Sequence, residues 1–153
     1  MMLANRREAF VIGATALIAS GAVAAETAGP NRGPAGAMRI FRVFASADGE
    51  SHIEQLAVAS TRKSLPVQEV LATSLGKGVE DWHHAPFRTF TINTAGQIKV
   101  ELSDGSSQHI GPGDLVFLED RSGKGHLTRL LTDGAALFLR MADDFDVVAW
   151  ARS

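Results

Sequence analysis

Four of the five histidines lie in one stretch, from Asp81 to Arg129. Two of them, His83 and His84, are adjacent, and His126 follows a glycine-rich loop. Imidazole moves protons near neutral pH and is a common ligand of divalent iron, manganese, nickel and zinc. This stretch therefore contains the candidate metal or acid–base site.

A second group of reactive side chains precedes His126 in the sequence and consists of Glu119, Asp120 and Lys124. Carboxylates beside a lysine and a histidine suit general acid–base catalysis, because such neighbours move pKa values toward neutrality. The alternative is structural: Glu119 and Asp120 would accept hydrogen bonds from backbone amides in the turn at 122–125.

Four residues near the histidine pair are candidates for contact with a substrate, namely Trp82, Arg88, Thr89 and Thr91. Arg88 would bind an anionic substrate if it faced the site, and otherwise it lies in solvent or at an interface. Trp82 either stacks on a ligand or packs at a strand end.

Short strand patterns separated by turns must position these side chains. Apolar and polar residues alternate over 87–94 and again from Ile98 to Leu102, and Asp104-Gly105 is typical of a hairpin turn. Leu115 to Leu118 form a continuous apolar run of strand length. The pattern predicts an all-β barrel or sandwich.

The sequence does not decide the secondary structure of two segments. Residues 61–78 fit a helix or short strands equally, because apolar residues recur at helical spacing after Pro66. Residues 142–153 are expected to pack on the barrel and cover one edge or side of the sheet, as a short helix or a strand.

Composition bounds the remaining possibilities. The 153 residues suffice for one domain, and a formal net charge of -2 argues against a nucleic-acid partner. The chain contains no cysteine, which excludes disulfides, thiolate metal sites and a cysteine nucleophile.

Residues 1–25 have the layout of a secretory signal peptide, with Arg6-Arg7 before an apolar run and small residues at its end. The arginine pair resembles a twin-arginine export signal, and the alternative for the apolar run is a single membrane anchor. Residues 26–37, rich in glycine and proline, are predicted to be a flexible linker. The mature protein is expected to be periplasmic or secreted and free of the membrane.

Four features together resemble the two sequence motifs of the cupin superfamily. They are Trp82-His83 at the start of a strand, Gly96 at its end, the corner at 111–114, and His126 after the glycine loop. The resemblance implies a single small jelly-roll barrel, a double-stranded β-helix. In cupins this barrel usually holds a divalent metal through two histidines and a glutamate of the first motif and one histidine of the second.

The resemblance covers residues 38–141. The sequences of the motifs resemble those of small bacterial single-domain cupins of unassigned activity. Matched position by position, it places metal ligands at His83 and His126. Ala85 and Thr89 stand where the second histidine and the glutamate would be. A third ligand would come from His84, if the chain bulges before Pro86, or from His52 or Glu54.

Three functions follow as expectations. The barrel cavity binds a small polar or anionic molecule and acts as a metal-dependent lyase, isomerase or dioxygenase through His83 and His126. Alternatively, it binds a small molecule without metal, or it is filled core in a structural dimer. A homodimer is expected in each case, because exposed strand edges need covering.

Overall fold

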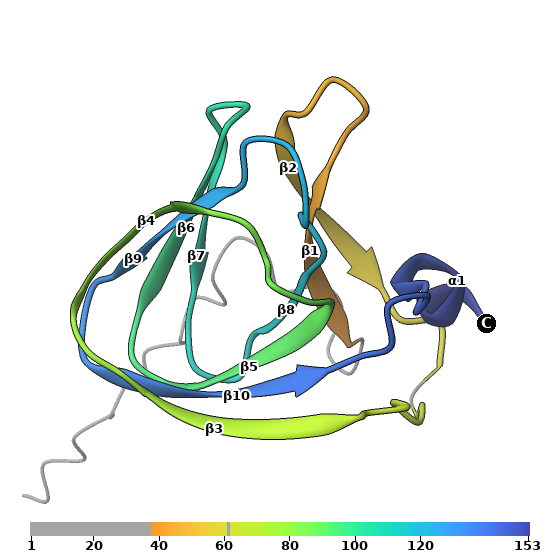
Figure 1. Cartoon of the computed structure of the whole chain (residues 1–153). Coiled ribbons are helices and arrows are strands. Elements are labelled where there is room, and N and C mark those ends of the chain that lie inside the picture. The colour runs from red at the N-terminus through yellow and green to blue at the C-terminus, as the bar shows by residue number, and fades with distance from the viewer. Residues whose placement is uncertain (1–37, 61) are drawn as a thin grey trace, which may run out of the picture. The chain divides into compact units, whose positions relative to one another are not determined.

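The computed structural model describes residues 38–60 and 62–153, and the predicted signal peptide and linker lie outside this part of the chain. The described residues form ten strands and one short helix (Figure 1). The strands are β1 (Arg39–Ala45), β2 (Ser51–Ala57), β3 (Glu69–Leu75), β4 (Gly78–His83), β5 (Thr89–Ala95), β6 (Ile98–Leu102), β7 (Ser107–Ile110), β8 (Leu115–Leu118), β9 (His126–Leu130) and β10 (Gly134–Arg140), and the helix is α1 (Val147–Arg152). Within these residues no helix has the length and apolar character needed to span a membrane.

The strands form two sheets that curve around a common interior. One sheet has the order β2-β1-β8-β5-β10-β3 and the other β4-β9-β6-β7. All strand pairs are antiparallel except the pair of β1 and β8. Figure 1 shows the sheets wrapped into a barrel, with β4 and β9 opposite β5 and β10. The predicted all-β jelly-roll barrel is confirmed.

The interior between the sheets is an apolar core built by alternation. On β6, Ile98, Val100 and Leu102 are buried, while the residues between them are partly exposed. A strand presents every second side chain to the same face, so this spacing lines the interior with three branched side chains. Val43 from β1 and Val116 from β8 pack against them from the other sheet.

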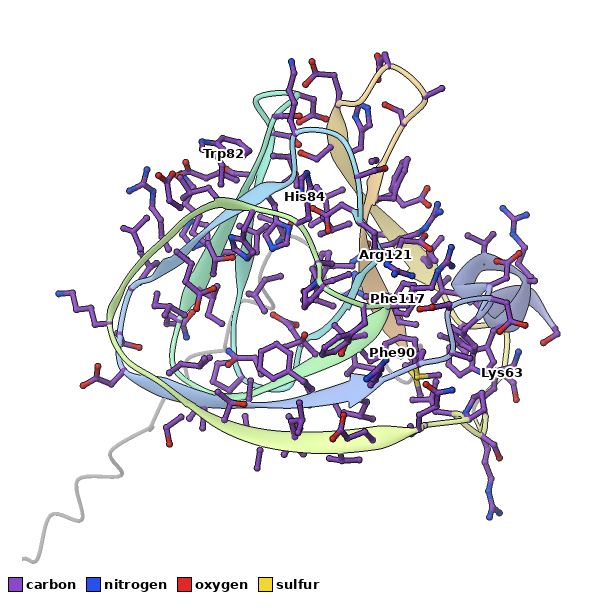
Figure 2. All side chains as sticks on the ribbon, viewed as in Figure 1. Lys63, Trp82, His84, Phe90, Phe117 and Arg121 are labelled. Carbon is purple, nitrogen blue, oxygen red and sulfur yellow. The ribbon has the colours of Figure 1, made fainter. Side chains whose placement is uncertain are left out.

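A second apolar core lies on the other face of the six-stranded sheet. Phe90 and Phe117 are fully buried there, with ring centroids 4.7 Å apart (Figure 2). Phe145 and Trp150 from the C-terminal segment make edge contacts with Phe90. Residues 142–153 therefore pack on the barrel, and the segment that follows Phe145 forms the short helix α1.

The N-terminus of α1 is capped by Asp146. Its side chain accepts hydrogen bonds from the backbone N–H groups of Val148 and Ala149, both at 2.9 Å. The bond from Ala149 is the main reason that the pKa of Asp146 lies below its usual value. Such a cap satisfies donors that have no partner inside the helix.

The segment 62–78, for which the sequence does not decide between a helix and strands, contains no helix. Val70, Leu71 and Leu75 belong instead to β3, which pairs with β10 alone and forms an edge of the larger sheet, while Leu65 and Val67 precede the strand and pack against the second core. Val70 on this strand is 57% exposed. The sequence pattern did not identify this strand, because an edge strand with little burial lacks the alternation of apolar and polar residues that marks a buried strand.

On the outer face of the smaller sheet, Glu101 ties β6 to β9. Its carboxylate accepts hydrogen bonds from Arg129, at 2.8 Å, and lies 3.1 Å from Lys99. These two cations lower the pKa of Glu101 to about 2. The corner before β8 is fixed by Asp114, whose side chain accepts a hydrogen bond from the backbone N–H of Gly111 at 2.8 Å.

Candidate functional site

A cavity of about 280 Å³ lies between the two sheets. Most of its lining is apolar, from residues such as Val100, Ile110 and Phe138. Two groups of polar side chains interrupt this surface. Glu80, His83, His126 and Thr128 come from β4 and β9, and Thr89, Thr91 and Asn93 come from β5.

The two histidines meet because β4 and β9 are neighbours. His83 and His126 are partners in the strand register, and their ring centroids are 4.4 Å apart. The structure thus places these two predicted site residues side by side. The side chain of His83 is 38% exposed, so this end of the cavity, called here the imidazole end, is open to solvent.

His126 is held by a buried carboxylate. Its Nδ1 lies 2.6 Å from Oδ2 of Asp120, and both side chains are almost completely buried. A carboxylate oxygen that accepts this hydrogen bond selects the tautomer with the proton on Nδ1, and in that neutral tautomer Nε2 carries the lone pair. His83 is oriented in the same way, since its Nδ1 donates to the backbone carbonyl of Asp81 at 2.6 Å.

The loop between β8 and β9, residues 119–125, positions this pair through close backbone contacts. Gly125 has a φ of +71° and packs against the backbone carbonyl of His83, and Gly123 has a φ of +78° and packs against the carbonyl of Gly49. His84 donates from Nε2 to the carbonyl of Gly123 at 2.6 Å. The loop is thus fixed between the β1–β2 turn and the end of β4.

The metal site implied by the cupin resemblance needs at least three protein ligands. His83 and His126 offer one free nitrogen each, and Oε2 of Glu80 lies 3.9 Å from Nε2 of His83. Over residues 38–60 and 62–153, however, no group of three or more His, Cys, Asp or Glu side chains is placed to hold a metal ion. The residues present therefore do not fit a conventional three-ligand centre.

The three predicted sources of a further ligand have other partners. The ring of His84 is bonded to the loop, as described above. His52 uses both ring nitrogens, with Ser46 and Asp104 each at 2.8 Å. Glu54 accepts a hydrogen bond from Arg42 at 2.6 Å. Thr89 and Ala85, at the remaining ligand positions, line the cavity but supply no imidazole or carboxylate.

The predicted acid–base group divides into three separate contacts. Asp120 pairs with His126 inside the barrel, whereas Lys124 forms an ion pair with Glu50 at the surface. Glu119 forms neither a catalytic cluster nor a turn cap, because it is held between two arginines. Of the proposed catalytic residues, only Asp120 is placed to act at the cavity.

The arginine pair around Glu119 is a structural feature of the barrel wall. The carboxylate contacts Nε of Arg42 and lies 2.7 Å from Nη1 of Arg88. Arg88 also donates to the carbonyl of Phe145 at 2.6 Å, which ties the C-terminal segment to the barrel. Burial alone would lower the pKa of Arg42, but bonds to Glu54 and Glu119 outweigh it and raise the pKa.

The four candidate substrate contacts also separate. Thr89 and Thr91 line the cavity. Arg88 points to Glu119, and Trp82 lies on the outside of the barrel, 47% exposed (Figure 2). Adjacent residues of a strand face opposite sides, which explains why Trp82 and His83 diverge.

Three polar residues of the cavity lining were not among the predicted site residues, namely Glu80, Asn93 and Thr128. Asn93 shares its strand face with Thr89 and Thr91 by the period of two, so its position was available from the alternation at 87–94. No comparable signal marks Glu80, because β4 lacks alternating burial.

The strand order and central cavity together define a small jelly-roll barrel. No family model matches the chain, and no curated protein matches it. Protein NMB1881 from Neisseria meningitidis is similar in structure, with 14% identity, a TM-score of 0.40, and coverage of 67% of this chain and 82% of that one. A Salmonella typhimurium LT2 protein that carries the name ethanolamine utilization protein Q gives 11% identity, a TM-score of 0.41, and coverage of 71% and 98%. Because both TM-scores lie below 0.5, these similarities are not used to assign the fold. The fold is assigned from the strand pairing itself.

Proposed function

We propose that this protein is an exported member of the cupin superfamily whose barrel cavity binds a small, mainly apolar molecule. The observation that carries the proposal is the cavity of about 280 Å³, which is mostly apolar and opens at the imidazole end. Binding sites for small molecules are typically such concave apolar spaces with a few placed polar groups. In the part of the chain that the structure describes, the lining holds no lysine or arginine, which favours a neutral ligand over an anionic one.

Filling the cavity is expected to weaken binding. Val100 is buried and lines the cavity, so Val100→Phe places a ring in the space that a ligand would occupy. Naphthalene, titrated into the purified protein and followed by NMR shifts of cavity residues, is expected to bind the original chain. We expect binding to weaken at least roughly tenfold in Val100→Phe, which corresponds to a loss of about 1.4 kcal/mol.

The matched control is Val70→Phe, the same change on the exposed edge strand β3. It should leave naphthalene affinity unchanged. If naphthalene causes no shifts at cavity residues, or if both variants bind it equally well, the cavity is not a binding site.

A second candidate is a metal-free enzyme that transfers protons, and the Asp120–His126 pair favours it. A buried carboxylate that accepts the Nδ1 proton orients the imidazole and stabilises the imidazolium that forms when Nε2 takes a proton. His126 is the general base and Asp120 holds its tautomer. In a bound ketone, Nε2 would remove a proton from the carbon next to the carbonyl, leaving an enolate, and would later return a solvent-derived proton.

This candidate predicts hydrogen–deuterium exchange in 2-tetralone, a ketone with acidic α-hydrogens. In D2O the purified protein should accelerate exchange, and His126→Gln should lower the acceleration by about 100-fold or more, the usual contribution of a general base. His52→Gln, outside the cavity, is the control and should leave the rate unchanged. Exchange no faster than in buffer would exclude this activity for the ketone.

Export and self-association remain proposals based on the sequence. The signal layout lies in residues 1–25, outside the described part of the chain. We propose a homodimer formed through the exposed edge strand β3, because an unpaired edge is able to pair with the same edge of a second copy. Light scattering of the purified protein would measure its mass.

A further inference from the structure

Among the described residues, two fully buried polar side-chain atoms of the cavity wall have no hydrogen-bond partner. They are Oγ1 of Thr91 and Oδ1 of Asn93. Thr91 is 9% exposed and Asn93 is fully buried, and both line the cavity. A buried polar atom without a partner costs about 1–3 kcal/mol, so each of these atoms is a position where a bound molecule gains a hydrogen bond.

The orientation of the Asn93 amide is fixed by its other half. Nδ2 donates to the carbonyl of Gly96 at 2.9 Å. A carbonyl only accepts hydrogen bonds, so the amide cannot be reversed without losing this bond. The unpartnered Oδ1 is therefore an acceptor, and a ligand must offer it a hydrogen-bond donor.

Thr91 differs from its neighbour on the same strand face. The hydroxyl of Thr89 already contacts the backbone carbonyls of Phe90 and Leu139, both at 3.2 Å. The hydroxyl of Thr91 has no such bond. Thr91 and Asn93 are two residues apart on β5, about 7 Å along the strand, so they form a polar pair in a mostly apolar wall.

This polar pair lies at a different depth from the histidines. Thr89 is level with Leu118 in the strand register, close to the loop that carries Asp120. Asn93 lies four residues further along β5, about 13 Å away, and is fully buried. When a ligand enters at the imidazole end, the end of the molecule that lies deepest in the cavity contacts Thr91 and Asn93.

We propose that the cavity selects neutral molecules that present a hydroxyl or N–H donor to Asn93 and Thr91. The inference rests on the proposed binding function and adds the chemical class of its ligand. The apolar wall accommodates the carbon skeleton, Oδ1 of Asn93 accepts from the donor group, and the Thr91 hydroxyl donates or accepts beside it. Alcohols, phenols and amides belong to this class, and ethers and hydrocarbons do not.

Calorimetric titration with naphthalene, 2-methoxynaphthalene and 2-naphthol tests the selection. The three share a ring system, and only 2-naphthol carries a donor. We expect 2-naphthol to bind about tenfold more tightly than the other two, the value of one net hydrogen bond. In Thr91→Val the advantage of 2-naphthol over naphthalene should fall at least threefold, while naphthalene affinity stays the same.

Thr91→Val keeps the shape of the side chain and removes a hydroxyl that makes no bond in the protein, so the variant should fold. Thr94→Val is the matched control, since Thr94 lies on the same strand but outside the cavity lining, and its hydroxyl donates to the carbonyl of Ala135 at 2.9 Å; it should leave the ligand preference unchanged. Asn93→Leu should abolish the remaining preference, although it also breaks the bond to Gly96.

The outcomes separate this inference from the proposed function. If all three compounds bind with equal affinity and Thr91→Val changes nothing, the cavity is a binding site but the donor selection is wrong. If none of the three binds, the binding function fails as well. A preference for 2-naphthol that survives in both Thr91→Val and Asn93→Leu would also overturn the selection.

Discussion

Gly125→Ala is expected to destabilise the barrel by about 3 kcal/mol. A residue with a side chain at positive φ costs roughly 1–2 kcal/mol, and overpacking in a tight site costs about 1–3 kcal/mol more. Both apply here, because Gly125 has a φ of +71° and an added Cβ would overlap the backbone carbonyl of His83, with the carbonyl carbon at only 2.7 Å. Backbone cannot move aside as a flexible side chain can. Urea unfolding followed by circular dichroism measures the difference.

Gly113→Ala separates the two contributions. Gly113 has a φ of +88°, but nothing lies within 4 Å of the position of its Cβ. Its replacement should cost only the backbone strain, about 1 kcal/mol. Equal losses of stability in Gly125→Ala and Gly113→Ala would show that the contact with His83 is not tight.

Glu119→Ala removes a buried carboxylate and is expected to destabilise the protein by about 3 kcal/mol. Removing one partner of a buried ion pair is costly because the remaining charge is left uncompensated. Arg88 loses its carboxylate partner and Arg42 keeps only Glu54, and the side chains of Arg42 and Arg88 are only 22% and 28% exposed. The change also frees β1, the start of β5 and the C-terminal segment from a common anchor. We expect lower stability in urea unfolding and faster amide exchange in α1.

Asp143→Ala is the control for this experiment. Asp143 pairs with Arg121 at 2.8 Å, but both side chains are well exposed, at 72% and 42%. Exposed ion pairs contribute about 0–1 kcal/mol. Losses of similar size in the two variants would show that burial of Glu119 does not strengthen its contacts.

Much of the fold is predictable from the sequence because local patterns agree with tertiary packing. The turn at Asp104-Gly105 and the alternation in β6 specify a hairpin whose apolar side chains all face one interior. β3 could not be predicted in the same way. Its pairing with β10 alone leaves its residues exposed, and burial is what creates a readable pattern.

The candidate site was predictable only where strand geometry decides it. Register places His83 beside His126, and the same geometry prevents His84 from joining them. The acid–base cluster could not be resolved, because the loop after β8 sends Glu119, Asp120 and Lys124 to three different partners. Sequence also does not reveal that Thr91 lacks a partner, since this depends on which carbonyls lie nearby.

Under the proposed function, the two faces of β5 have separate roles, because one packs in the outer core and the other lines the cavity. Phe90 belongs to the outer core under the C-terminal segment, whereas Thr91 and Asn93 on the inner face take no part in that core. A change of ligand could therefore be acquired through single substitutions on the inner face, at little expense in folding. For the same reason, β5 is the strand on which a redesigned barrel of this kind would be given a new specificity.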